Sequence, residues 1–206
     1  MTTFASDIQV SFIRDEVALD ADGISTAASV SEDAALTING ALASGGSVTN
    51  ASGRQVTILS AGDDSGNTFT VVGTDVNEAA LTEAVTGANA GTATSSGYFK
   101  TIASITLSGG DSGGNVSAGI NGNAADVVFA GRMRLKGYSI VSGGTAGEID
   151  FLNSGVSGTS IFKARTIGTD NTTLDNTVPA EGILFKDGMF VTFVIATIDM
   201  MTFFYA

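Results

Sequence analysis

The stretch that decides the fold, residues 63–120, reads DDSGNTFTVVGTDVNEAALTEAVTGANAGTATSSGYFKTIASITLSGGDSGGNVSAGI. It contains short runs of β-branched and aromatic residues, such as residues 98–107, which have the length of strands. Gly, Asn, Asp and Ser separate these runs, and at residues 73–75, 87–89 and 109–111 they favour tight turns. The stretch therefore predicts a β-meander that forms half of a sandwich.

The same pattern extends toward the N-terminus. Alternation places Ile8, Val10 and Phe12 on one face of a strand. Residues 20–23, Asp-Ala-Asp-Gly, predict a turn. A calcium loop is the alternative, but its third oxygen ligand would fall at Ile24 and its glycine comes too early, so the turn is favoured.

Further turns and strands follow from local chemistry. Residues 39–40 are an Asn-Gly step between apolar runs and predict a hairpin, and residues 54–59 predict the next strand. Residues 121–123, Asn-Gly-Asn, predict another turn. The strands expected beyond it are rich in β-branched and aromatic residues and comprise residues 133–141, 148–152, 160–167, 182–185 and 189–198.

Charge changes along the chain. Residues up to Asp126 include 14 acidic and 3 basic side chains, whereas the remainder has 7 and 6. Such asymmetry indicates two domains with different surroundings. We therefore expect an all-β protein of two β-sandwich domains in tandem, jelly-roll-like or Ig-like. Residues 1–22 would form an N-terminal arm or edge strand, residues 23–126 an acidic sandwich, and residues 127–206 the C-terminal sandwich.

Composition excludes several function classes. The net charge of −12 would repel nucleic acid and anionic membranes, so neither is an expected partner. The chain has no cysteine for disulfides or thiolate metal sites, and no histidine, the commonest general base and metal ligand. The N-terminus lacks a positive segment followed by an apolar core, so no secretory signal is expected.

The C-terminal run, residues 189–206, is the most apolar part of the chain. Its 18 residues raise the question of a membrane span, but Asp199 lies within it, no Lys or Arg flanks its far end, and its residues favour strands. We expect two strands with a turn near Asp199. Apolar side chains on both faces imply a neighbouring copy as cover, so the expected interface residues are Phe190, Phe193, Phe203, Phe204 and Tyr205.

Three cations alternate with other residues near the start of the second half. Arg132, Arg134 and Lys136 are expected on one strand face. That face is either simply solvated or contacts the carboxylates of a partner, and both interpretations stay open.

One string looks catalytic. Residues 110–114, Gly-Asp-Ser-Gly-Gly, match the nucleophile segment of trypsin-like proteases and the Gly-x-Ser-x-Gly elbow of hydrolases. Both motifs need a base that accepts the serine proton, and no histidine is present. A Ser-Lys dyad would need a buried lysine, and Lys100 is the candidate by default. We expect a turn with an inert Ser112, and an exposed acidic loop rather than a cation site at residues 63–64. No catalytic residue, metal or cofactor is therefore expected.

Six segments of the first half and the aromatic end of the chain resemble structural proteins of tailed bacteriophages, notably those of marine and cyanobacterial hosts. What the segments share with those proteins is a succession of short strands and turns. They comprise residues 56–58, 64–66, 69–75, 81–87, 98–102 and 105–109. Residues 182–185, 191–192 and 203–205 resemble the C-terminal β-domain of small phage virion proteins. The resemblance covers about three quarters of the chain and carries no functional residues over.

The resemblance implies a non-enzymatic virion protein assembled in the host cytoplasm as a homo-oligomer. The first hypothesis is a capsid decoration or cement protein that binds the major capsid protein over subunit joints. The second is a tail component, such as an adaptor, a nozzle part or a fibre base, bound to other virion proteins. The third is a host-surface carbohydrate-binding β-module, which is disfavoured because such modules stack sugars on Trp or Tyr and this chain has no Trp and 3 Tyr.

Overall fold

The computed structural model describes residues 8–14, 17–179 and 181–206. These residues form β-strands and one short 3-10 helix, so the predicted all-β class is confirmed. Within the described ranges, no helix is long and apolar enough to cross a membrane. The elements are β1 (Gln9–Arg14), β2 (Asp20–Ala28), β3 (Ala43–Ser44), β4 (Ser47–Ser60), β5 (Thr68–Thr74), β6 (Ala80–Thr86), β7 (Thr92–Thr94), β8 (Phe99–Ser108), β9 (Val116–Phe129), β10 (Met133–Ser142), β11 (Ala146–Asn153), β12 (Thr159–Ile167), β13 (Thr173–Thr177), β14 (Ile183–Phe185), β15 (Met189–Val194), η1 (Ile195–Thr197) and β16 (Ile198–Tyr205).

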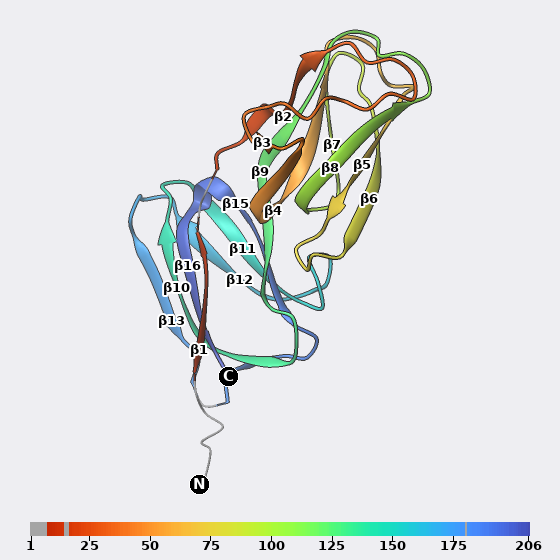
Figure 1. The fold of residues 1–206 in the computed structure, drawn as a ribbon. Helices are drawn as coiled ribbons and strands as arrows, with labels where there is room; N and C mark the ends of the chain where they lie inside the picture. The colour runs from red at the N-terminus through yellow and green to blue at the C-terminus, as the bar shows by residue number, and fades with distance from the viewer. Residues whose placement is uncertain (1–7, 15–16, 180) are drawn as a thin grey trace. The chain divides into compact units, whose positions relative to one another are not determined.

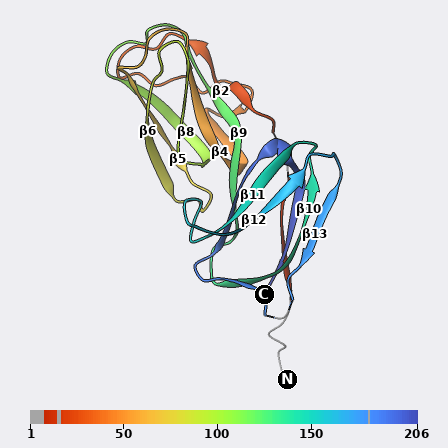
Figure 2. The same ribbon diagram turned by 180° about the vertical axis from the view of Figure 1, so that it is seen from behind.

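The chain divides into two compact units (Figures 1 and 2). The terminal unit comprises Met1–Val17 and Asn123–Ala206, and the inserted unit comprises Ala18–Gly122. This grouping differs from the expected tandem order because β1 pairs with β16 and so joins the C-terminal half of the chain. Strand β9 contributes its first part to the inserted unit and its second part to the terminal unit.

Two sheets build the terminal unit. One has the order β1-β16-β10-β13, with β14 also paired to β10, and the other runs β12-β11-β15-β9. Phe151 of β11 stacks on Phe162 of β12 with ring centroids 4.2 Å apart, and meets Phe203 of β16 edge-on at 6.0 Å. Because these rings come from both sheets, the sheets face one another across a shared core.

The inserted unit has the strand order β9-β4-β8-β5-β6, with β2 paired to β9 and with β3 and β7 paired to β4. Its core is separate and includes the fully buried Phe69 and Phe99. Strands β5 and β8 pair in register from Thr68↔Ser108 to Val72↔Ser104, which places Phe69 beside Leu107. The inserted unit therefore has a hydrophobic core of its own.

The predicted turn at residues 121–123 is wrong, because these residues lie inside the continuous strand β9. The side-chain amide of Asn121 donates to Oε1 of Gln55 on β4 at 3.0 Å. The carbonyl of Asn121 also accepts a hydrogen bond from the guanidinium of Arg54. Residues 121–123 favour a turn by composition, but these contacts from the neighbouring strand β4 hold them in an extended conformation.

The predicted hairpin at residues 39–40 and the predicted turn at residues 20–23 are also wrong. Strand β2 begins at Asp20, and the later segment runs beside it: the N–H of Gly40 donates to the Ile24 carbonyl at 3.0 Å. A Cβ at position 40 would lie 2.3 Å from the Asp22 carbonyl oxygen. Gly40 of the Asn-Gly step therefore lets two backbone segments approach closely, and the step does not form the turn of a hairpin.

The C-terminal run forms two strands with a turn near Asp199, as predicted: the chain reverses at η1, two residues before Asp199, where the Thr197 hydroxyl donates to the Val194 carbonyl at 2.6 Å. The turn predicted at residues 73–75 begins later than expected. Strand β5 continues to Thr74, and the turn follows at Asp75, whose Oδ1 accepts from the N–H groups of Asn77 and Ala79. In both places a side-chain hydrogen bond to the backbone fixes the turn.

Candidate functional site

The outer face of the β1-β16-β10-β13 sheet carries an apolar strip. We define the apolar strip as Ile8, Val10 and Phe12, which are 58%, 56% and 61% exposed, together with Phe204, which is 37% exposed. Val10 lies directly opposite Phe204 in the β1–β16 register. Because Ile13 of the same strand points into the core, the alternation of β1 turns the apolar strip toward solvent.

A hollow of about 440 Å³ adjoins the apolar strip. Gly137 lies opposite Phe204 in the β10–β16 register and offers no side chain that would fill the space. The Asn176 amide donates to the Tyr138 hydroxyl at 3.2 Å, which fixes part of the wall. The lining combines apolar and polar groups, namely Ile8, Lys136, Gly137, Tyr138, Ser139, Asp175, Asn176, Thr177 and Phe204.

The aromatic residues expected at a subunit interface separate into two groups. Phe193, Phe203 and Tyr205 belong to the core of the terminal unit, and Phe190 is 4% exposed although it lies outside that cluster. The chain itself therefore covers most of the C-terminal run, including the face that was expected to need a neighbour. Only Phe204 among these five aromatic residues keeps substantial exposure, because it points outward from β16.

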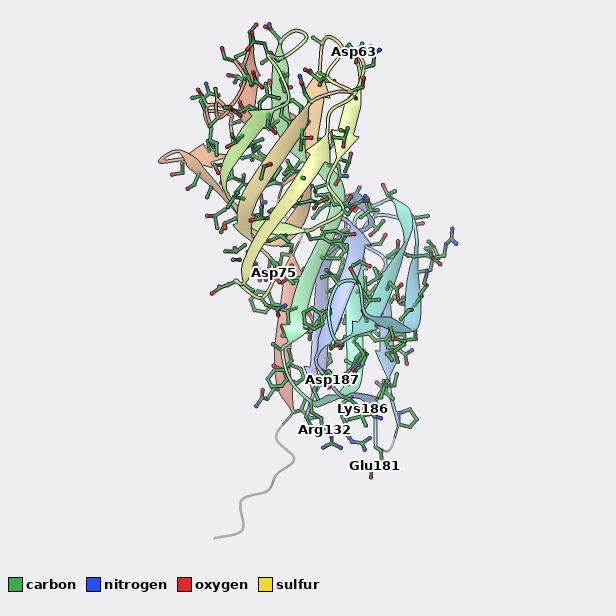
Figure 3. All side chains as sticks on the ribbon, turned by 90° about the vertical axis from the view of Figure 1, so that its right-hand side faces the viewer. Asp63, Asp75, Arg132, Glu181, Lys186 and Asp187 are labelled. Atoms are coloured by element: carbon green, nitrogen blue, oxygen red, sulfur yellow. The ribbon has the colours of Figure 1, made fainter. Side chains whose placement is uncertain are left out.

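The three cations do not share one strand face throughout. Arg134 and Lys136 alternate with buried Met133 and Leu135 on β10, whereas Arg132 precedes the strand. The Arg134 guanidinium donates to the Glu181 carbonyl at 3.2 Å. Figure 3 shows Arg132 and Glu181 at the same end of the terminal unit, with Lys186 and Asp187. Lys136 alone of the three lines the hollow.

The catalytic-looking string forms a packed turn. The Ser112 hydroxyl oxygen accepts a hydrogen bond from the Val30 N–H at 2.9 Å, and the Ser112 N–H donates to the Val30 carbonyl at 2.9 Å. Oδ1 of Asp111 accepts from the Glu32 N–H at 2.8 Å. These contacts attach the turn to residues 30–32, and Ser112 therefore joins two loops of the inserted unit.

The expected exposed acidic loop at residues 63–64 holds for Asp63 but is wrong for Asp64. Asp64 is fully buried, and its Oδ1 accepts from the Asn67 amide and the Gly113 N–H, both at 2.9 Å. Asp63 is exposed at a loop (Figure 3), and hydrogen bonds from the Ser65 hydroxyl and N–H lower the pKa of its carboxyl. Across the described parts of the chain, no group of three or more acidic, His or Cys residues could hold a metal ion. Asp64 thus connects the loops around it through the two hydrogen bonds to its Oδ1.

The sequence identified one face of β1 but not its direction. Alternation groups Ile8, Val10 and Phe12, yet it does not indicate whether that face is inside or outside. The opposite face carries Gln9, Ser11 and Ile13, and only Ile13 of these is buried in the core. The hollow beside Gly137 has no sequence signal, because β10 and β13 meet there only in the folded chain.

Comparison with protein families, curated proteins and solved structures finds no match to this chain.

Proposed function

We propose that this protein is a non-enzymatic structural protein of a tailed-bacteriophage virion, and that it decorates the capsid. The apolar strip is the observation that carries the proposal. Ile8, Val10 and Phe12 each expose more than half of their surface on one sheet face. Contiguous exposed apolar side chains on a folded protein mark surfaces that bind other proteins.

The surroundings of the apolar strip favour a protein partner. Phe204 supplies an aromatic anchor beside the hollow, and interface centres are enriched in aromatic residues that enter pockets. Lys136 and Arg14 flank the same face and offer donors to carboxylates of a partner. The resemblance of the sequence to phage structural proteins supports a partner within the virion, and we propose the major capsid protein rather than a tail protein.

Quantitative mass spectrometry of purified particles tests the proposal. A capsid decoration protein is expected in copies comparable with the major capsid protein. A few copies per particle would instead identify the tail component, and absence from particles would overturn both assignments. Phe204→Lys should reduce incorporation of the protein into particles, whereas Ile161→Lys, an exposed apolar residue of the other sheet, should not.

The hollow supports a second candidate, a carbohydrate-binding module. The aromatic residue Phe204 and the charged residues Asp175 and Lys136 are among those that line a space of about 440 Å³. Such a mixture suits the apolar face and the hydroxyls of a sugar. Saturation-transfer NMR with host-surface oligosaccharides tests it: signal that disappears in Phe204→Ala supports sugar binding, and no signal excludes it.

A further inference from the structure

Strand β1 is an open sheet edge. Among the strands that the structure describes, it has a neighbour on one side only in the order β1-β16-β10-β13, and Figure 1 shows it beside β16. Its pairing runs without a shift from Gln9↔Tyr205 to Arg14↔Met200. Half of its backbone N–H and C=O groups therefore face away from β16, where a further strand can pair with them.

The strands at the other sheet ends carry a charged residue at their centre or in their outward row. Strand β13 has Asp175 at its centre, and β6 has Glu83 at its centre. Glu83 accepts hydrogen bonds from the N–H groups of Ser96 and Gly97 at 2.6 and 2.8 Å. Charges on an edge strand oppose the addition of another strand, because the charged group would lose water.

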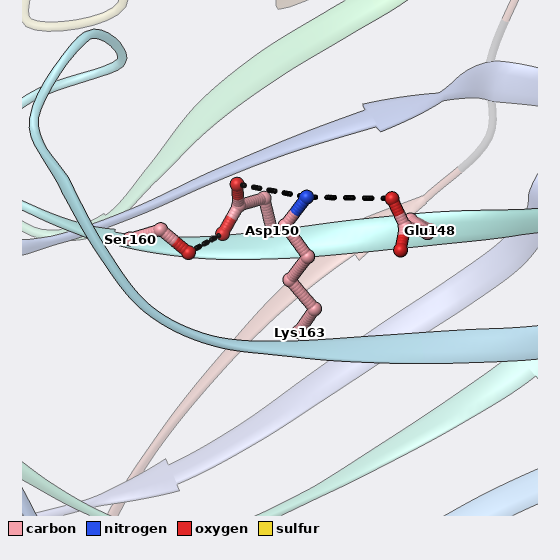
Figure 4. Close-up of polar contacts among 4 residues, drawn as sticks. All are labelled: Glu148, Asp150, Ser160 and Lys163. Carbon is pink, nitrogen blue, oxygen red and sulfur yellow. Dashed lines mark hydrogen bonds and ion pairs between the residues drawn. The ribbon is translucent and has the colours of Figure 1, made fainter.

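Strand β12 shows this protection most clearly. Between the exposed Ile161 and Ile167 it presents Lys163 and Arg165. The Lys163 ammonium contacts carboxylates on β11, that of Glu148 at 3.3 Å and that of Asp150 at 3.8 Å (Figure 4). Two charged residues thus interrupt the apolar side chains along this edge.

Strand β1 has no such interruption. The segment from Ile8, just before the strand, to Ile13 contains no charged residue, and its outward side chains are Ile8, Val10 and Phe12. The first charge is Arg14 at its end, whose guanidinium lies 5.1 Å from the Phe12 ring centroid. An edge whose central residues are apolar and uncharged is a surface for strand addition.

We propose that β1 pairs antiparallel with β1 of a second copy, about a two-fold axis at Ser11. This register pairs every residue from 8 to 14 with a residue of the other copy. It places Phe12 of each copy opposite Val10 of the other. A pair of an aromatic and a β-branched side chain across two strands is favourable. A two-fold axis also makes the two edges identical, as an isologous contact requires.

The self-pairing of β1 leaves the outer sheet face free. Two copies of the apolar strip would then lie side by side on one continuous sheet, so the same dimer presents a doubled surface to another partner. One pair of short strands is a small interface, so we expect a weak dimer with a dissociation constant in the micromolar range. The inference does not rest on the virion assignment, because purified protein alone tests it.

Sedimentation equilibrium over a micromolar concentration series tests the dimer. Wild-type protein should dimerise, and the double variant Val10→Lys with Phe12→Lys should raise the dissociation constant by about tenfold or more, because it places charges on the edge. The matched control, Ile161→Lys with Ile167→Lys, should dimerise like wild type. Circular dichroism checks that all three proteins are folded. A wild-type monomer throughout, or an unaffected double variant, overturns the proposal.

The register has its own test, because the natural chain contains no cysteine. Ser11→Cys places two thiols opposite each other across the two-fold axis, so mild oxidation should cross-link it rapidly. Ser157→Cys, at an exposed position between β11 and β12, is the control. Cross-linking of Ser11→Cys that is faster than the control supports the register, and equal rates contradict it.

Discussion

Asp64 shows how one buried carboxylate can organise several loops. Its Oδ1 receives hydrogen bonds from Asn67 and Gly113, which lie on two different segments. Asp64→Ala would leave both donors unpaired in the interior and should lower the free energy of unfolding by about 2–4 kcal/mol. Urea unfolding measures the change, with the exposed Asp63→Ala as the control that should cost much less. Equal losses for the two variants would contradict the role of Asp64.

Ser112 tests whether the protease-like string is structural. Ser112→Ala removes the oxygen that accepts the Val30 N–H and should cost about 1 kcal/mol of folding stability. A fluorophosphonate probe should not label the folded wild-type protein, because the hydroxyl serves as an acceptor in loop packing. Specific labelling of Ser112 would show that the serine is activated and that the structural interpretation is wrong.

Asp63 provides a prediction about pH. Hydrogen bonds from Ser65 hold its pKa below the ordinary value of 3.8. A carboxyl with a lowered folded pKa stabilises the protein above its unfolded pKa, and that contribution is lost as the pH falls through the folded pKa. Ser65→Ala should therefore raise the pKa of Asp63 toward 3.8, as measured by NMR titration of its carboxyl carbon. An unchanged pKa would assign the shift to another cause.

At the scale of the element, β16 places two adjacent phenylalanines on opposite faces. Phe203 is fully buried against Phe151, whereas Phe204 is 37% exposed. Phe203→Ala should cost about 3–5 kcal/mol of folding stability, as for other large core truncations. Phe204→Ala should cost much less while it reduces binding at the outer face. Thermal unfolding measures the difference, and equal destabilisation would mean that Phe204 is also a core residue.

The sequence predicted strands better than turns. Period-two alternation and β-branched composition located β5, β8, β10, β11 and β12 closely, because those signals are local. The turn predicted at residues 121–123 failed because contacts from β4 hold those residues extended, and the hairpin predicted at residues 39–40 failed because Gly40 pairs with Ile24 of β2 instead. Strand β13 was missed because its residues, Thr-Leu-Asp-Asn-Thr, are polar and β10 supplies their pairing. The candidate surface was half predicted: the sequence indicated Phe204, but only the β1–β16 pairing places it beside Val10.

For the whole molecule, charge opposes self-association. The inserted unit carries 10 acidic and 2 basic residues, and the terminal unit 11 and 7, within a net charge of −12. Two copies therefore approach with least repulsion through their terminal units. Raising the salt from low ionic strength to about 0.15 M should strengthen the dimer, because it screens this repulsion. Sedimentation at both salt levels measures the effect, and a weaker dimer in salt would indicate an interface that depends on ion pairs.

The pairing of β1 with β16 also determines when each unit can fold on the ribosome. The inserted unit closes early, because its end strands pair at Asp20↔Ile120 as soon as that length of chain has emerged. Strand β1 can pair only after β16 has been synthesised, because Gln9 pairs with Tyr205. At synthesis rates of about 5–20 residues per second, that delay is about 10–40 seconds. During this time the apolar β1 is exposed on the nascent chains of one polysome. Pairing of β1 between two nascent chains would lead to aggregation, whereas the same pairing between two finished proteins gives the proposed dimer.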